Sequence, residues 1–203
     1  MFIALRRVLV SVLEAELQVE MTKSVGREFF AGETIEVARQ LLGIKLIYKG
    51  SEGIIVETEA YKDDAASHAV TRPKKGVMLR ETYGRVYIYF IYGMYHCLNF
   101  TTEKHGTGAV LIRAIEPTAG IEAMKARRGT DRILNLTNGP GKLFQAFDFD
   151  PALHGEAIGK SIRLQRPAAP HKIQIACSPR VGISKAIDLP WRFFIDGNKF
   201  VSR

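Results

Sequence analysis

The spacing of apolar and polar residues predicts a helix and two strands in the first third of the chain. Apolar residues recur on one face of the segment 35–42, and Gly43 follows it as a stop. Two strand patterns, over 45–48 and 53–60, flank residues with the composition of a hairpin turn. This order predicts a helix followed by two paired strands.

The second predicted strand ends in two carboxylates. A period of two places Ile55, Glu57 and Glu59 on one face, and the apolar run before Glu57 indicates a buried strand whose polar end opens into a pocket. The two acids are about 7 Å apart at the backbone, from a rise of about 3.3 Å per residue. Such a pair can act as acid and base in glycosidic cleavage, and two exposed strand glutamates are the alternative.

The middle of the chain joins a basic segment to a run that is dense in tyrosine. Residues 62–85 are polar and basic, and we interpret them as a long loop of the kind that often carries function. The tyrosine run that follows predicts a strand with Tyr87 and Tyr89 on one side. The alternation breaks around Gly93, where we expect a turn or a bulge.

The second half of the chain alternates strand and helix patterns. Residues 109–115 predict a strand, after which Pro117 opens a helix that Gly129 closes. The segment 138–142 is a tight turn, which either begins a helix or contacts a phosphate through backbone N–H groups. Short strand-like pieces follow near the end, at 172–176 and 192–195.

Together these elements predict one α+β domain on a curved, mainly antiparallel sheet that is partly barrel-like and flanked by helices. The length of 203 residues, without a repeat, a low-complexity segment or a linker, agrees with a single domain. We assign residues 21–203 to this domain. We interpret residues 1–20 as an N-terminal extension without a role in the site, and translation from Met21 is an alternative.

Charge narrows the choice of partners. The chain carries 29 Lys and Arg against 21 Asp and Glu, a net charge of +8, and its pI is near 9.6. This balance suits a polyanionic partner through electrostatic steering and counterion release. A basic protein without such a partner is the alternative.

Cysteine and histidine usage argues against disulfides and metal sites. Cys97 and Cys177 form no Cys-x-x-Cys pair, which favours a reducing, cytoplasmic location. The five histidines lack zinc-ligand spacing, so we expect no metal and no cofactor. No apolar run is long enough to span a bilayer, so we expect no membrane association. We also expect the protein to be a monomer.

The tyrosines are concentrated near the carboxylates. Six of the seven lie between residues 61 and 95. Flat rings, an acid/base candidate and a basic background are the ingredients for chemistry on a nucleobase, although a half-buried sheet face is the alternative for the rings alone. At the expected turn around Gly93, large side chains project from the sheet and could wedge into a base stack.

A series of short motifs follows along the chain after Arg27. The motifs are Val56-Glu57-Thr58-Glu59-Ala60-Tyr61, His68, Tyr87-x-Tyr89-x-x-Tyr92-Gly93-Met94-Tyr95, Asn99, Leu111-Ile112-Arg113-Ala114-x-Glu116-Pro117, Asn138-Gly139-Pro140-x-Lys142-Leu143, Arg180-Val181-Gly182 and Arg192-Phe193-Phe194. In this order and number they closely resemble the alkyladenine (3-methyladenine) DNA glycosylases of the vertebrate type. The resemblance extends to the C-terminus.

The resemblance implies a DNA-repair enzyme that flips a damaged purine out of duplex DNA and hydrolyses its N-glycosidic bond. It implies that Glu59 is the general base that activates the attacking water, and that Arg113 helps to hold this water and the glutamate. It also implies three roles in handling the base: a sandwich around the flipped base by Tyr61, His68 and Tyr89, a filter against guanine at Asn99, and a DNA-intercalating wedge at Tyr92.

The chemistry of the expected substrates agrees with these roles. A purine alkylated at N3 or N7 is cationic and leaves readily, so a base plus positioning suffices without a strong acid. No lysine lies in the motif core, so we expect a monofunctional hydrolase of damaged double-stranded DNA, with Glu57 structural. The substrates implied are 3-methyladenine, 7-methylguanine, hypoxanthine and ethenoadenine. A non-catalytic nucleic-acid-binding module and a paired-carboxylate nucleoside or sugar hydrolase are the alternatives.

Overall fold

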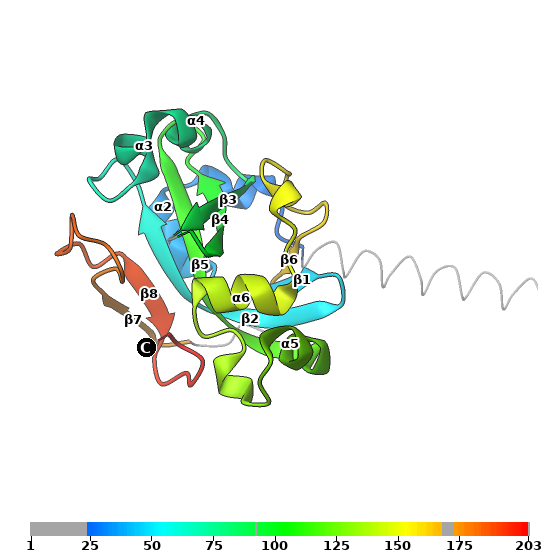
Figure 1. The fold of residues 1–203 in the computed structure, drawn as a ribbon. Coiled ribbons are helices and arrows are strands. Elements are labelled where there is room, and N and C mark those ends of the chain that lie inside the picture. The colour runs from blue at the N-terminus through cyan, green and yellow to red at the C-terminus, as the bar shows by residue number, and fades with distance from the viewer. Residues whose placement is uncertain (1–23, 92, 168–172, 203) are drawn as a thin grey trace, which may run out of the picture.

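A computed structural model of the protein describes residues 24–202, apart from residue 92 and residues 168–172 (Figure 1). These residues form eight strands: β1 (Lys45–Tyr48), β2 (Ser51–Tyr61), β3 (Val86–Ile91), β4 (Tyr95–Thr102), β5 (Gly108–Ala119), β6 (Arg163–Gln165), β7 (Ile175–Ser178) and β8 (Arg192–Ile195). They also form five α-helices: α2 (Thr34–Gln40), α3 (His68–Thr71), α4 (Pro73–Glu81), α5 (Ile121–Arg128) and α6 (Pro140–Phe147). Three short 3-10 helices are η1 (Arg27–Ala31), η2 (Ile133–Asn135) and η3 (Pro151–Leu153). The predicted extension 1–20 lies outside the described residues.

The strands pair in one antiparallel sheet with β2 near its centre. The strand order is β3-β4-β5-β2-β1-β6. One side of β2 pairs with β5 along most of its length, and the other pairs first with β1 and then, over residues 57–59, with β8. Figure 1 shows β2 and β5 as long, curved strands through the middle of the molecule. The predicted α+β domain on a mainly antiparallel sheet is confirmed.

A bulge in β2 separates the two carboxylates from the apolar residue before them. The register with β5 shifts between Ile55 and Glu57. As a result, Ile55 lies in the main hydrophobic core with Ala60, whereas Glu57 and Glu59 both bind Arg113. The expectation that Ile55 shares a face with the acids is therefore wrong, because one inserted residue reverses the alternation of a strand.

Helices α2 and α6 cover the sheet and enclose its main core. Helix α2 packs on β2, where the Thr58 hydroxyl donates to the Ala38 carbonyl (2.8 Å). Helix α6 packs against β4 and β5, as Figure 1 also shows, and buries Leu143 and Phe147 completely. Burying such side chains stabilises a fold by about 1.5–3 kcal/mol each, so the packing of α6 stabilises the sheet.

The segment 62–85 contains two helices, α3 and α4, so its interpretation as a long loop is wrong. Helix α4 buries only Gly76 and Leu79; Met78 is half-buried, and the other positions are exposed. A single buried turn leaves too little apolar periodicity to identify a helix from sequence. Ala69 and Leu79 nevertheless pack with Tyr87 in a second, smaller core.

Strand β5 is longer than its sequence pattern indicates. Pro117 lies within β5, and helix α5 begins only at Ile121. Proline lacks the N–H that an inner strand needs, but the register of β5 shifts beside it, between Glu52 and Gly53 of β2. The end of the helix at Gly129 is confirmed, with a left-handed φ of 60°. The described part of the chain contains no helix that could cross a membrane.

Candidate active site

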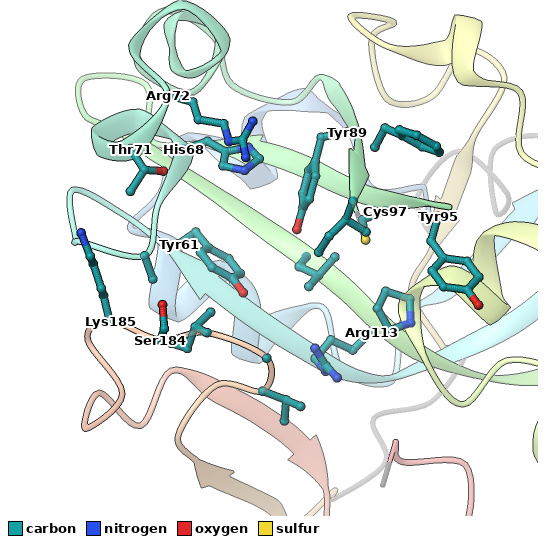
Figure 2. A pocket seen from close by; sticks show the side chains of 18 of the residues that line it. Tyr61, His68, Thr71, Arg72, Tyr89, Tyr95, Cys97, Arg113, Ser184 and Lys185 are labelled. Carbon is teal, nitrogen blue, oxygen red and sulfur yellow. The ribbon is translucent and has the colours of Figure 1, made fainter. Parts of the chain in front are cut away.

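A cavity of about 560 Å³ opens between the end of β2, helix α3, the β3–β4 pair and the segment after β7 (Figure 2). Strands β2, β3 and β5 bring side chains to it from the sheet, and α3 supplies the facing wall. The residues around it include Tyr61, His68, Arg72, Tyr89, Arg113, Val181 and Lys185. Four of the residues predicted from sequence therefore meet at one cavity.

Glu59 lies directly behind the wall of this cavity. Its side chain is fully buried, and its carboxylate accepts hydrogen bonds from the Tyr61 hydroxyl (2.8 Å) and the Val181 amide (2.7 Å). Nη1 of Arg113 lies 3.3 Å from the same carboxylate. Because these three neighbours line the cavity themselves, the Glu59 carboxylate lies just beyond its surface.

Arg113 joins Glu59 to Glu57. Its Nε donates to Glu57 Oε1 (3.1 Å) while its Nη1 pairs with Glu59. Burial alone would lower the pKa of Arg113, but the attraction of the two carboxylates outweighs burial and raises this pKa. The guanidinium therefore stays charged and balances the negative charge behind the cavity.

Glu57 has a separate set of donors. In addition to Arg113, Nε of Arg192 (2.6 Å) and both the amide (2.6 Å) and the hydroxyl (2.8 Å) of Ser202 donate to it. Glu57 is fully buried. With four donors on two oxygens it is placed to hold β2, β8 and the C-terminal segment together, which supports the structural role expected for it.

Aromatic rings form other walls of the cavity. The His68 and Tyr89 rings meet edge to face, with centroids 4.5 Å apart, and His68 Nδ1 is 2.9 Å from the Tyr87 hydroxyl. Burial raises the pKa of Tyr61 and of Tyr89, and burial with the nearby charges of Arg72 and Lys75 lowers the pKa of His68. At neutral pH these rings are uncharged and present flat surfaces to the cavity (Figure 2).

Asn99 lies beside this cavity rather than in its lining. It lines a small adjoining pocket of about 30 Å³ together with Tyr61, His68 and Tyr89. Its Nδ2 donates to the carbonyls of Tyr87 (3.1 Å) and Cys97 (3.3 Å), so both amide protons are engaged by backbone. The side chain is therefore fixed in orientation at the inner end of the aromatic walls.

The predicted wedge residue Tyr92 lies outside the described residues. Its neighbours Met94 and Tyr95 are 66% and 47% exposed, so neither is a core residue of the described structure. Tyr95 also lines the cavity. The left-handed φ of Gly93 (68°) confirms the expected turn.

One contact of Glu59 was not predicted from sequence. The Val181 amide belongs to the motif Arg180-Val181-Gly182, which carried the resemblance without any assigned role. A backbone donor leaves no trace in residue type, and 122 positions separate it from Glu59. Only the fold could reveal this contact.

Comparison with known proteins assigns this chain to a family. The sequence profile of the methylpurine-DNA glycosylase family matches residues 28–199. The chain belongs to this family. It is therefore a DNA glycosylase, a hydrolase of N-glycosidic bonds that acts on alkylated purines in DNA repair.

Relatives of the methylpurine-DNA glycosylase family match along almost the whole chain. Three of them carry the name "Putative 3-methyladenine DNA glycosylase". The protein of Rhizobium johnstonii is 46% identical over 180 residues, covering 87% of this chain and 88% of its own. That of Prosthecochloris aestuarii is 45% identical over 188 residues, covering 87% and 90%. That of Methanoculleus marisnigri is 42% identical over 186 residues, covering 86% and 96%.

Membership of the methylpurine-DNA glycosylase family decides between the alternatives left open by the sequence. A glycosylase of this family acts on DNA, which agrees with the net charge of +8. A non-catalytic nucleic-acid-binding module and a nucleoside or sugar hydrolase are excluded by this membership. The resemblance identified from the motifs is confirmed.

Proposed function

We propose that the protein, as a monomer, flips alkylated or deaminated purines out of double-stranded DNA and hydrolyses their N-glycosidic bond with water activated by Glu59. The substrates are 3-methyladenine, 7-methylguanine, hypoxanthine and ethenoadenine, and the product is an abasic site. One observation carries the proposal. A fully buried carboxylate, held by Tyr61, Val181 and Arg113, lies directly behind a cavity with aromatic walls.

In the proposed reaction, water attacks the sugar C1′ and gives its proton to Glu59. The new C1′–O bond forms as the C1′–N bond breaks, and the bonding electron pair leaves with the purine. Arg113 offsets the negative charge of Glu59 and fixes one of its oxygens. A cationic alkylated purine needs no proton in order to leave, so a base and good positioning are sufficient.

The aromatic walls are proposed to hold the flipped purine. Tyr61, His68 and Tyr89 surround the same space, and stacking on such rings contributes about 1–3 kcal/mol per base. This gain offsets the cost of unstacking, a few kcal/mol. Because the rings are uncharged, they accept both neutral and cationic bases, and a cation is attracted to their faces.

Two further residues are assigned by resemblance to the family. Asn99 lies at the inner end of the aromatic walls, where its bulk would disfavour the exocyclic amino group of guanine. Tyr92 would fill the gap that the flipped nucleotide leaves in the duplex. The exposure of its neighbours Met94 and Tyr95 supports a hairpin tip that meets DNA.

Excision from a duplex with a single ethenoadenine or hypoxanthine tests the proposal. We expect Glu59→Gln to lose the alkali-labile abasic sites that the native protein produces and to retain binding of the lesion duplex. Glu52→Gln is the matched control, since Glu52 pairs with Lys45 on the partly exposed side of β1 and β2. Full excision by Glu59→Gln would show that another group activates the water.

A further inference from the structure

A guanidinium that the proposed mechanism does not use is buried beside the cavity. The Arg180 side chain is fully buried and forms a two-pronged pair with Asp64, with Nη1 3.0 Å from Oδ2 and Nη2 2.8 Å from Oδ1. Nη1 also donates to the Ala60 carbonyl (3.0 Å). The Tyr61 and Trp191 rings lie against the guanidinium, with centroids 4.7 and 5.1 Å from its Cζ.

Arg180 is connected to both groups that donate to Glu59. It precedes Val181, whose amide donates to one carboxylate oxygen, and it contacts the ring of Tyr61, whose hydroxyl donates to the other. The Ala60 carbonyl that it binds belongs to the peptide joined to Tyr61. The position of Arg180 therefore sets the positions of two separate donors.

Asp64 is itself fixed by the backbone around it. Its carboxylate accepts from the amides of Lys62 (3.2 Å) and Ala66 (2.9 Å), within the turn that leads to α3. Burial would raise the pKa of Asp64, but the hydrogen bonds from Arg180 and these two amides lower it. An ionised, immobile carboxylate is a firm anchor for a guanidinium.

Glu59 does not need the charge of Arg180 as its counter-ion, because Arg113 already pairs with Glu59 and Asp64 pairs with Arg180. Stability alone also explains the pair poorly, since apolar residues of similar volume often replace a buried ion pair without loss. The pair with Asp64 fixes the orientation of the Arg180 side chain. A planar fork on a carboxylate fixes orientation as well as distance.

We propose that Arg180 is a positioning residue for hydrolysis, which acts with Asp64 to hold the Tyr61 hydroxyl and the Val181 amide on Glu59. The proposal rests on the proposed role of Glu59 as the general base. Hydrolysis is sensitive to such positioning, because a displacement of about 1 Å can cost a factor of about 100 in rate.

Single-turnover excision of 7-methylguanine, measured with excess protein in the native and Glu59→Gln backgrounds, tests the proposal. We expect Arg180→Lys and Asp64→Asn to slow excision on the order of 10- to 100-fold in the native background. In the Glu59→Gln background they should cause no further loss, because the group they position is gone. Binding of the lesion duplex should change less than about threefold.

Arg27→Lys, at an exposed position, is the control for loss of a guanidinium that stacks on a ring. Arg27 also lies on a tyrosine ring, with Cζ 4.0 Å from the Tyr83 centroid, but it does not line the cavity. This variant should excise at the native rate. A loss as large as that of Arg180→Lys would show that removing any stacked guanidinium damages the protein, and would overturn the proposal.

NMR spectroscopy tests the proposal without measuring excision. It is used where a variant folds poorly or where the Glu59→Gln rate is too low to measure. In the native protein the Val181 amide proton bonds a carboxylate at 2.7 Å, which predicts a downfield resonance. In Asp64→Asn, which keeps one acceptor for Arg180, this resonance should move upfield. An unchanged resonance would overturn the proposal.

The outcomes distinguish failure of the proposed role of Arg180 from failure of the proposed role of Glu59. Equal slowing by Arg180→Lys in both backgrounds would mean that Arg180 acts on the fold or on the base, not through Glu59. Full excision by Glu59→Gln alone would instead contradict the proposed function, whatever the Arg180 variants do.

Discussion

At the scale of single residues, the two carboxylates of β2 differ in what surrounds them. Glu59 has the Tyr61 hydroxyl, the Val181 amide and one nitrogen of Arg113, all at the cavity. Glu57 has four donors, and of the residues that supply them only Arg113 lines the cavity. Two glutamates two positions apart therefore have different surroundings, which agree with the proposed base at Glu59 and the expected structural role of Glu57.

Loss of the Glu57 charge should destabilise the protein. Glu57→Gln leaves Arg113 and Arg192 buried without their shared anion, which costs about 3–5 kcal/mol for a broken buried pair. Urea unfolding monitored by circular dichroism measures this loss. Glu52→Gln, which breaks the partly exposed pair with Lys45, should cost less than about 1 kcal/mol. Equal, small effects would mean that Glu57 is not a structural anchor.

The lowered pKa of His68 predicts how stability changes with pH. Burial and the charges of Arg72 and Lys75 hold this pKa below about 6.5, the value in an unfolded chain. The unfolded state therefore binds the proton more tightly, and stability falls as pH drops from about 6.5 toward the folded-state pKa. Denaturant unfolding between pH 8 and pH 5 should show a steeper loss for the native protein than for His68→Gln. Parallel curves would contradict the lowered pKa of the half-buried His68.

At the scale of elements, helix α6 braces the hairpin formed by β3 and β4. The ring of Tyr95 lies on the backbone of Gly141, where an added Cβ would come within 2.9 Å of the ring. The His96 ring stacks on Phe144, with centroids 5.1 Å apart. The turn 138–142 therefore begins a helix, as one reading of the sequence predicted, and its glycine allows the hairpin to approach.

Gly141→Ala should displace the hairpin tip. The new methyl group meets Tyr95, so Tyr95 and the adjoining turn at Gly93 must move. We expect excision from duplex DNA to fall several-fold more than excision from single strands, because only the duplex needs a wedge. The control is Gly155→Ala, since a Cβ there meets nothing within 4 Å, although its φ of 87° costs some stability. An equal loss on both substrates would argue against a brace.

How far the elements could be predicted depended on how much apolar surface each one buries. Strands β2 and β5 and helix α2 have clear patterns and were predicted. Helix α4 was missed, because only Gly76 and Leu79 are buried along its nine residues. The face of β2 on which Ile55 lies was also predicted wrongly, since no residue type marks the bulge between Ile55 and Glu57.

At the scale of the whole molecule, the site is assembled from distant parts of the sequence. Sequence motifs could predict that Glu59, Arg113 and the aromatic residues belong to one site, because such motifs depend on residue type, and the structure brings these residues together. The contacts of Glu59 with Val181 and of Glu57 with Ser202 span 122 and 145 positions and involve backbone amides. Only closure of β8 and the C-terminal segment onto β2 creates them, so the pattern along the chain could not.

The net charge of +8 predicts that DNA binding weakens steeply with salt. Each phosphate neutralised releases counterions, and the logarithm of affinity falls with the logarithm of salt concentration by about 0.9 per phosphate. Arg72 is exposed at the cavity mouth, so Arg72→Gln should make this slope shallower by about 1. Binding of Glu59→Gln to a lesion duplex between 50 and 200 mM salt, roughly the range in which such slopes are resolved, measures it without excision. Lys45→Gln, which removes the same charge beside Glu52 and away from the cavity, should leave the slope unchanged. If both variants lower the slope equally, the charge acts as a diffuse field; if only Arg72→Gln does, the duplex lies across the mouth of the cavity, where a flipped purine can enter.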